Sequence, residues 1–285
     1  MLKKIYIEIT NHCNLQCSFC PQSKQNKKMM SVADFHHILK EVMPLTGEVC
    51  LHVTGEPLVH PNFLEMLGLC EKMQIKVQLT TNGLLLESVE NALLKSPAIR
   101  QINFSLQALM DNFPDRKIAN HLLPFLDFIK RGCALRPEMY FNLRLWNQGY
   151  HVFENAEVFD IVEKYFQIII KRTVDVGGIK SKRIWNRLYL HFDSRFDWPS
   201  LDNQYLGEVG TCKGLVDHIG VLSNGEVIPC CLDKDGVISL GNCLKEPLEN
   251  ILNSKKANRM REGFKKGVLV ETLCQHCSYI RRFTK

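Results

Sequence analysis

The sequence predicts an α/β fold: a partial (β/α)6 TIM-like barrel followed by a small C-terminal α+β domain. Short strand patterns alternate with helical patterns up to about residue 171, and this alternation then stops. The candidate functional motifs of the first part also fall at the carboxyl ends of the expected strands, which is where barrels place their active sites. We therefore expect domains at 1–171 and 212–285, with a linker at 172–211.

The expected strands carry side chains that alternate between apolar and polar. In a parallel sheet covered by helices on one side, the apolar face meets the helices and the polar face lines the lumen, where a ligand binds. A solvent-wetted antiparallel sheet is the alternative, but the intervening helices disfavour it. Strands are expected at 4–10, 48–54, 75–81, 99–106, 138–146 and 166–171, and helices at about 31–43, 61–73, 86–95, 116–131 and 154–164.

Length and composition are those of a soluble globular protein. The chain has 285 residues, 45% hydrophobic and 23% charged, and no apolar run of membrane-spanning length. Because Glu8 interrupts what would be the apolar part of a signal peptide, a cytoplasmic protein with no membrane partner is expected. The net charge of +6 is spread over short groups without an RNA-binding motif, so a nucleic-acid partner is not expected.

Three of the twelve cysteines lie close together directly after the first expected strand, at Cys13, Cys17 and Cys20. Twelve cysteines in a cytosolic chain point to metal rather than to disulfides. Iron–sulfur clusters normally take four thiolates, so a group of three suggests a cluster with one open iron. Structural zinc, with His12 as a fourth ligand, is the alternative.

The Cys-x3-Cys-x-aromatic-Cys spacing, with Phe19 as the aromatic residue, resembles that of the radical S-adenosylmethionine (SAM) superfamily. The resemblance implies a [4Fe-4S] cluster whose open iron binds the methionine part of SAM. It also implies reductive cleavage of SAM to a 5'-deoxyadenosyl radical, which takes a hydrogen atom from the substrate.

Further residues resemble SAM-binding positions of this superfamily, over roughly residues 3–171. Thr54-Gly55-Glu56-Pro57 is similar to the GGEP motif that holds the methionine amino group, with threonine in place of the first glycine. Asn82 matches the end of the third strand, and Ser105 lies where a polar group often meets the ribose. Arg144 has the planar donors that match a methionine carboxylate. For Ser105 and Arg144, a polar barrel residue without a cofactor role is the alternative.

A second set of cysteines lies in the C-terminal part. An Asn224–Gly225 turn predicts a hairpin, and residues 246–262 are expected to be helical. Four thiols complete a cluster or a zinc site: Cys212, Cys230, Cys274 and Cys277. The pattern resembles the twitch domain, a shorter relative of the SPASM domain, which implies one auxiliary [4Fe-4S] cluster. Cys231 and Cys243 are extra, and each is a buried residue, a substitute ligand or a reactive thiol.

The function that follows is that of a radical SAM oxidoreductase, in which the auxiliary cluster accepts an electron from the substrate radical. Modification of a peptide or protein side chain is the alternative, and a non-catalytic metal or electron carrier that binds RNA is the alternative of another class. Flavodoxin or ferredoxin is expected as the electron donor, because no flavin or nucleotide fingerprint is present. The residues expected to touch substrate are Glu8, Gln78, Asn103 and Asn142.

Overall fold

The computed structural model describes residues 1–21, 23–114, 117–148, 155–172, 180–194 and 196–283. The chain divides into two compact units, each assembled from separate stretches of sequence. The first consists of residues 1–13, 21–76 and 196–285, and the second of residues 14–20 and 77–195. In the described part of the chain, no helix is long and apolar enough to cross a membrane.

The strands of the first unit follow the order β10-β9-β8-β1-β2. Strand β1 pairs in parallel with both β2 and β8, so that Ile5 lies beside Val49 on one side and Ile219 on the other. The two pairings from β8 to β10 are antiparallel and include the hairpin predicted at Asn224–Gly225. The strands are β1 (Lys4–Ile7), β2 (Glu48–Cys50), β8 (His218–Val221), β9 (Glu226–Ile228) and β10 (Gly241–Asn242).

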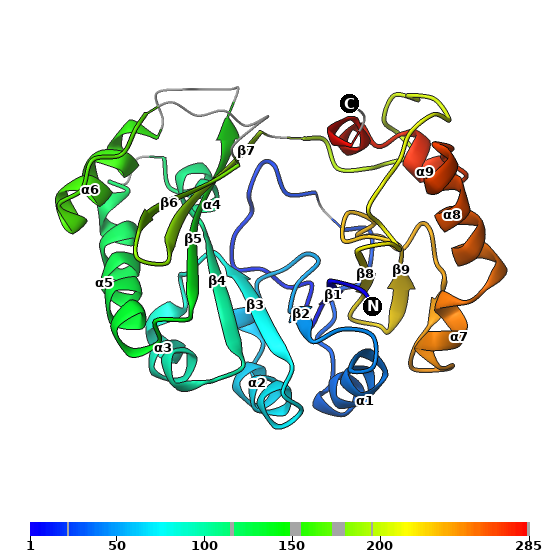
Figure 1. Cartoon of the computed structure of the whole chain (residues 1–285), viewed down its shortest axis with the longest axis horizontal. Helices are drawn as coiled ribbons and strands as arrows, with labels where there is room; N and C mark the ends of the chain where they lie inside the picture. The colour runs from blue at the N-terminus through cyan, green and yellow to red at the C-terminus, as the bar shows by residue number, and fades with distance from the viewer. Residues whose placement is uncertain (22, 115–116, 149–154, 173–179, 195, 284–285) are drawn as a thin grey trace. The chain divides into compact units, whose positions relative to one another are not determined.

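In the first unit, α1 packs against α2 and α7, and α7 also contacts α8 and β10 (Figure 1). Ser31 caps α1 as predicted, because its side chain accepts a hydrogen bond from the Asp34 amide at 3.0 Å. The helices are α1 (Val32–Val42), η1 (Pro57–Val59), α2 (Phe63–Lys72), α7 (Leu248–Leu252), α8 (Lys255–Lys266), α9 (Thr272–Gln275) and η2 (Ser278–Arg282).

The second unit has strands in the order β3-β4-β5-β7-β6. The pairings from β3 to β7 are parallel, and β6 is an antiparallel edge strand. The elements are β3 (Lys76–Thr81), whose first residue belongs to the first unit, α3 (Leu86–Lys95), β4 (Ile99–Ser105), α4 (Leu106–Asn112), α5 (Ala119–Leu135), β5 (Tyr140–Gln148), α6 (Ala156–Phe166), β6 (Ser181–Trp185) and β7 (Leu188–Ser194).

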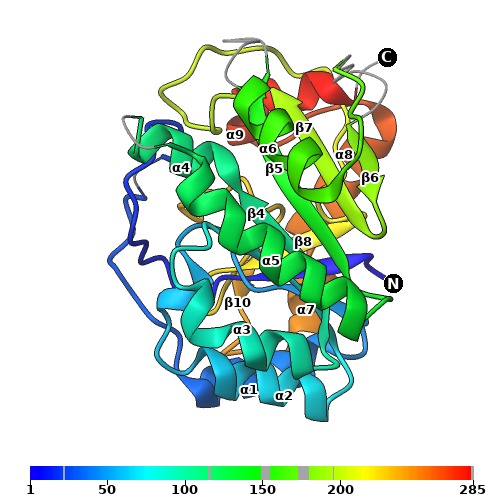
Figure 2. The same ribbon diagram turned by 90° about the vertical axis from the view of Figure 1, so that its left-hand side faces the viewer.

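Helix α5 covers the apolar face of β4 and β5, as the alternation of side chains predicts (Figure 2). The ring of Phe104 stacks on Phe125 with 4.5 Å between centroids, and Phe128 meets Phe141 edge to face at 6.0 Å. Gly132 permits this close packing, because a Cβ atom there would lie 2.4 Å from the Phe141 ring. The polar faces of these strands are thereby left to the other side of the sheet.

Two expected elements are wrong. The strand expected at 166–171 does not form, because α6 continues to Phe166 and Gln167 ends it in the left-handed conformation at φ 54°. The parallel partner of β5 is instead β7, within the segment expected to be a linker. Two helices, α7 and α8, replace the single helix expected at 246–262. The first ends at the cap residue Asn253, and the Ser254 side chain caps the start of the second.

Candidate active site

The first cysteine group lies in the loop after β1. Cys13 and Cys20 are exposed and Cys17 is half-buried, as is Phe19. The Cys20 amide donates to the Cys17 carbonyl at 3.0 Å, which closes a turn between these two thiols. The thiols are therefore accessible to a metal group.

The end of α4 holds this loop in place within the second unit. The carboxylate of Asp111 accepts hydrogen bonds from the Ser18 amide at 2.6 Å and from the Ser18 hydroxyl at 2.5 Å. The Asn112 side chain accepts from the Gln16 amide at 2.9 Å and donates to the Cys17 sulfur at 3.1 Å. Nothing in the sequence marked Asp111 or Asn112, since they lie more than 90 residues from the loop that they bind.

In the first unit, the loop of residues 54–57 packs against the chain just before Cys13. Gly55 has φ 73°, and a Cβ atom at this position would lie 2.4 Å from the Thr10 carbonyl oxygen. The Glu56 amide donates to the His12 carbonyl at 2.8 Å, and the Glu56 carboxylate accepts from the Leu58 amide at 3.1 Å. Pro57 then begins the short helix η1. The glycine that the motif requires is thus explained by its close approach to another backbone segment.

Glu8 follows β1 and is 0% exposed. One carboxylate oxygen accepts hydrogen bonds from the Thr54 amide at 3.1 Å and the Thr54 hydroxyl at 2.6 Å, and the other accepts from the Ser223 amide at 3.2 Å. All three donors to this carboxylate are protein groups of the first unit, and the contact with substrate that we expect of Glu8 stays a prediction.

Two other expected substrate residues, Asn103 and Asn142, form a ladder across strands of the second unit. Asn103 is buried. Its side-chain amide donates to the Thr80 hydroxyl on β3 at 3.1 Å and accepts from the Asn142 side chain on β5 at 2.8 Å. Gln101 also donates to Asn103 at 2.8 Å, and Gln78 pairs with Gln101 in the strand register. The polar face is therefore a connected set of amides that orders its own side chains.

Ser105 and Arg144 lie directly beside one another in the register of β4 and β5, and the next position across is His191 on β7. The Arg144 guanidinium lies over the Trp146 ring, 4.7 Å from its centroid, and the Trp146 indole donates to His191 at 3.0 Å. Sequence reasoning missed His191, because no strand was expected at β7.

Asn82 contacts the first cysteine loop, since its side chain donates to Asn14 at 2.8 Å. It also accepts a hydrogen bond from the Leu84 amide at 3.1 Å, which holds the turn after β3. The contacts that we expect between these positions and SAM stay predictions.

The second cysteine group lies within the first unit and fits an iron–sulfur cluster. Burial raises the pKa of Cys230 well above its ordinary value, and the neighbouring thiols of Cys231, Cys212 and Cys274 raise it further. Burial and then Cys212 and Cys277 raise the pKa of Cys274, and burial is also the main cause that raises the pKa of Cys277 to about 11. Half-buried thiols that disfavour one another's negative charge need a bound cation to become thiolates.

Geometry for one metal ion is not present: among the described residues, no three His, Cys, Asp or Glu side chains converge closely enough to hold a single ion. The two extra cysteines differ in their surroundings. Burial raises the pKa of Cys231, while a hydrogen bond from Tyr6 lowers it. Cys243 is buried and its thiol donates to the Gly225 carbonyl at 3.2 Å, which makes it a packing residue.

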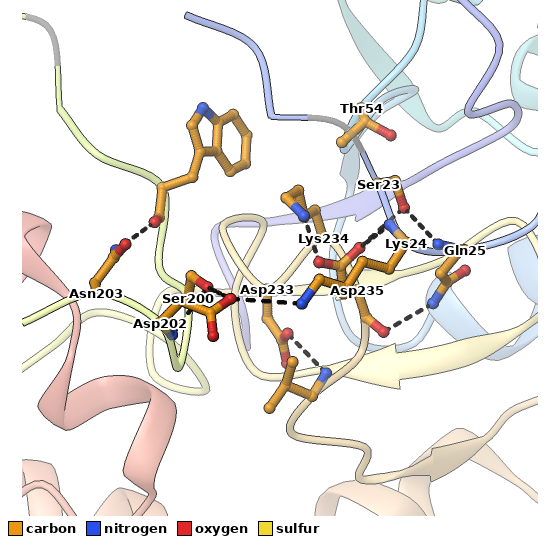
Figure 3. A network of polar contacts seen from close by, with 12 residues as sticks. Ser23, Lys24, Gln25, Thr54, Ser200, Asp202, Asn203, Asp233, Lys234 and Asp235 are labelled. Carbon is orange, nitrogen blue, oxygen red and sulfur yellow. Dashed lines mark hydrogen bonds and ion pairs between the residues drawn. The ribbon is translucent and has the colours of Figure 1, made fainter.

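A polar clamp, defined here as Ser23, Lys24, Gln25 and Asp235, joins the segment after the first cysteine loop to the loop after Cys231 (Figure 3). The Asp235 carboxylate accepts from the Ser23 hydroxyl at 3.0 Å and the Lys24 amide at 2.8 Å, and Gln25 donates to the Asp235 carbonyl at 3.1 Å. Lys24 also lies 3.6 Å from the Asp202 carboxylate.

Comparison with known families identifies the class of protein. A model of the radical SAM superfamily matches residues 7–136, and a model of the SPASM iron–sulfur cluster-binding domain matches residues 212–278. The chain therefore carries a radical SAM domain followed by a C-terminal SPASM domain. These two domains imply [4Fe-4S] clusters and SAM as cofactors, and the assignment of the two cysteine groups as cluster ligands stays a prediction.

Individual relatives share only part of this chain. It is 26% identical over 168 residues to GTP 3',8-cyclase of Synechocystis, which covers 57% of this chain and 50% of the relative. It is 29% identical over 113 residues to a tungsten-containing aldehyde ferredoxin oxidoreductase cofactor-modifying protein of Pyrococcus furiosus, covering 38% and 32%. The chain thus spans half or less of the length of these relatives.

Two solved structures show the fold over nearly the whole chain. BtrN in complex with AdoMet and 2-DOIA has a TM-score of 0.63 at 16% identity, covering 98% of this chain and 93% of that one. Streptococcus suis SuiB bound to the precursor peptide SuiA has a TM-score of 0.65 at 17% identity, covering 99% and 72%. The predicted α/β fold with partial-barrel strands and a C-terminal cluster domain is confirmed.

Proposed function

We propose that this chain is a radical SAM oxidoreductase that removes two electrons from its substrate. When bound, the clusters and SAM supply a 5'-deoxyadenosyl radical that takes a hydrogen atom from the substrate, and an acceptor for the second electron. The proposal gives each cysteine group one task. Cys13, Cys17 and Cys20 hold the cluster that binds SAM, and the C-terminal thiols hold the auxiliary cluster.

The observation that carries this proposal is the number of thiols in the C-terminal group. The Cys212 thiol raises the pKa of Cys230, Cys274 and Cys277, and Cys277 raises the pKa of Cys274, which supports a single group held by these four thiols. Four protein thiolates occupy all four irons of a cluster and leave none for substrate. Such a group is suited to accept an electron rather than to bind the substrate.

The other residues of the site orient the two small molecules. The Thr54-Gly55-Glu56-Pro57 loop holds the methionine amino group, Asn82 and Ser105 contact the nucleoside, and Arg144 binds the methionine carboxylate. The Trp146 ring beside Arg144 restrains the guanidinium, since the cation lies over its face. The substrate meets the polar faces of the strands around Gln78, Asn103 and Asn142.

Reduction of the first cluster needs an external electron donor, and we propose flavodoxin or ferredoxin. The chain carries a net charge of +6, which favours docking of an acidic partner. The rate of reduction should then fall as salt screens this attraction. A rate that does not change with salt contradicts the docking proposal.

The oxidoreductase proposal is tested by product stoichiometry under anaerobic conditions. Reconstituted protein is incubated with SAM, a reductant and a panel of polyols, with GTP included because several relatives are GTP 3',8-cyclases. We expect one 5'-deoxyadenosine for each product that is lighter by two hydrogen atoms. Product without SAM cleavage, or a product of unchanged or higher mass, contradicts the proposal.

A Cys274→Ala, Cys277→Ala variant separates the two cysteine groups. We expect it to retain about four of about eight irons and to form 5'-deoxyadenosine without oxidised product. The matched variant, Cys17→Ala, Cys20→Ala, should retain the other cluster and form no 5'-deoxyadenosine. Zinc in place of iron in native protein contradicts the proposal that these cysteines hold iron–sulfur clusters.

Peptide modification is the second candidate, because SuiB was solved with a precursor peptide and anSMEcpe with a Cys-containing peptide, at TM-scores of 0.65 and 0.63. Both likenesses cover 99% of this chain. Peptides containing cysteine therefore form a second panel in the same assay. A peptide product made at the expense of SAM, with no reaction of the polyols, favours this candidate.

A further inference from the structure

Glu8 holds an unusual position for a carboxylate, since it is fully buried directly after β1, a strand that is paired on both sides within the first unit. A buried carboxylate is costly unless hydrogen bonds or a cation compensate its charge. Within the described residues no basic side chain forms an ion pair with Glu8, and its three donors are the Thr54 amide, the Thr54 hydroxyl and the Ser223 amide. Hydrogen bonds from the loop at Thr54 and the loop at Ser223 thus compensate the buried Glu8 carboxylate.

The first of these loops begins with Thr54. Two of the three hydrogen bonds fix this residue, and one of them uses the hydroxyl that a glycine at this position would lack. The next two residues are fixed independently, Gly55 by its close approach to Thr10 and Glu56 by its amide bond to His12. The amides of Thr54 and Glu56 therefore each have a hydrogen-bond acceptor, and Glu8 provides the one for Thr54.

The second loop belongs to the SPASM domain. Ser223 follows β8 and precedes the turn of the β8–β9 hairpin, and β8 pairs in parallel with β1. Glu8 also donates its own amide to the Val221 carbonyl at 2.8 Å. The Glu8 carboxylate consequently bridges the loop that follows β2 and the hairpin that leads to Cys230.

We propose that Glu8 is a positioning residue that fixes the backbone of residues 54–56 for SAM binding and couples this loop to the hairpin of the SPASM domain. This rests on the proposed function, in which the 54–57 loop holds the methionine amino group. Thr54 and Glu8 act as a pair, because the Thr54 hydroxyl donates a hydrogen bond that the Glu8 carboxylate accepts. Glu8 then acts on SAM through Thr54 rather than by touching the substrate.

The test compares variants that break one bond each. Thr54→Val removes the hydroxyl and keeps the side-chain shape, while Thr54→Ser keeps the hydroxyl and is the matched control. Glu8→Gln keeps the size but exchanges one acceptor oxygen for an amide donor. Because hydrogen bonds to charged groups are the stronger ones, we expect Thr54→Val and Glu8→Gln to raise the KM for SAM by about tenfold or more. Thr54→Ser keeps the hydroxyl donor and should raise this KM several-fold less than Thr54→Val does.

A merely structural role is separated from positioning by two further readouts. Iron content and the maximal rate of 5'-deoxyadenosine formation should stay near native, so that the loss lies in KM and not in kcat. Hydrogen exchange at the Ser223 amide should become faster in Glu8→Gln and stay native in Thr54→Val. The two substitutions combined should cost less than the sum of their separate effects, since they break a shared interaction.

The outcomes that overturn this inference differ from those that overturn the proposed function. If native protein cleaves SAM but Thr54→Val binds it as tightly as native, the positioning role is wrong and the function stands. If native protein with a full iron complement forms no 5'-deoxyadenosine, the proposed function itself is wrong. A Glu8→Gln variant that fails to fold leaves Thr54→Val against Thr54→Ser to decide.

Discussion

The side-chain amide of Asn112 donates a hydrogen bond to the sulfur of Cys17 over 3.1 Å. Hydrogen bonds to cluster sulfurs raise a reduction potential, because they stabilise the more negative reduced state. We expect Asn112→Ala to lower the potential of the first cluster by on the order of tens of millivolts. A potentiometric titration followed by electron paramagnetic resonance measures this shift.

The matched control for that variant is Ser18→Ala. It removes the hydroxyl that donates to Asp111 and so perturbs the same loop without touching the sulfur. Its potential should stay near native. Equal shifts in both variants would mean that the loop conformation, and not the bond to sulfur, sets the potential.

Much of the fold follows from periodicity in the sequence. Apolar positions on the face of the expected strands that meets the helices, such as Ile5, Leu79 and Phe141, are fully buried. Alternation with period two is a local property of a strand, so it can be read without knowing the partner strands. The hairpin at Asn224–Gly225 is confirmed for the same reason, since its turn residues are adjacent in sequence.

The missed strand shows where local patterns mislead. The segment 166–171 contains three consecutive isoleucines, yet Ile169 is 95% exposed, because the left-handed Gln167 turns the chain out of α6. The true neighbour of β5 follows a tight turn at Asn186, which has φ 41°. Asparagine between two runs of strand-forming residues was the available signal.

The residues of the candidate site also divide into those that a local sequence pattern predicts and those that it does not. Cysteine spacing identifies both cysteine groups because ligand spacing is local, and the 54–57 loop carries a local motif. The partners of Glu8 and Cys17 are not local, since Ser223 lies 215 residues from Glu8 and Asn112 lies 95 residues from Cys17. Such contacts depend on strand order and register, which one sequence does not specify.

Gly55→Ala should disable the 54–57 loop. The new Cβ atom would lie 2.4 Å from the Thr10 carbonyl oxygen, and alanine would be strained at φ 73°. We expect a free energy of unfolding lower by about 1–3 kcal/mol and a loss of SAM binding. Denaturant unfolding and equilibrium dialysis with SAM measure the two effects.

Gly47→Ala is the control for that substitution. A Cβ atom at Gly47 meets no atom within 4 Å, and the residue has no positive φ. Its unfolding free energy should change by less than about 0.5 kcal/mol. If both glycines tolerate alanine equally, the close approach of Gly55 to Thr10 is not a constraint on the loop.

The polar clamp at Asp235 should stabilise the first unit in a manner that depends on pH. Burial alone raises the pKa of Asp235, but hydrogen bonds from Lys234, the Lys24 amide and Ser23 outweigh it and hold the pKa below its ordinary value. Asp235→Asn should therefore lower the unfolding free energy at neutral pH by about 1–3 kcal/mol. The difference from native should shrink below about pH 4, as the native carboxylate itself becomes protonated.

The second acidic partner of Lys24 provides a matched control for the clamp. The Asp202 side chain is 82% exposed and lies 3.6 Å from the Lys24 ammonium. An exposed ion pair contributes little, so Asp202→Asn should change the unfolding free energy by less than about 1 kcal/mol. Equal losses for Asp202→Asn and Asp235→Asn would contradict the role given to the buried carboxylate.

His218 should make the first unit less stable in mild acid. Burial, and then the positive charge of Lys4, lower the pKa of His218 to about 4, while Asp217 opposes them. Histidine in the unfolded chain binds a proton below about pH 6.5, so the unfolded state holds more protons than the folded state between pH 6.5 and 4. The unfolding free energy should consequently fall across this range as the pH is lowered, by on the order of 1–3 kcal/mol.

Two variants test whether His218 causes this fall. His218→Asn removes the titrating group, so its unfolding free energy should decline less between pH 6.5 and 4 than that of the native chain. Lys4→Met removes the neighbouring positive charge and should raise the pKa of His218, which nuclear magnetic resonance of the imidazole protons reports directly. The Tyr6 ring contacts both groups: its centroid lies 5.7 Å from that of His218 and 5.2 Å from the Lys4 ammonium. Neither variant alters Tyr6. If the unfolding free energy of His218→Asn declines as much as that of the native chain, other groups cause the acid sensitivity. If it declines less, and the pKa of His218 rises in Lys4→Met, the burial of this imidazole beside a lysine causes it.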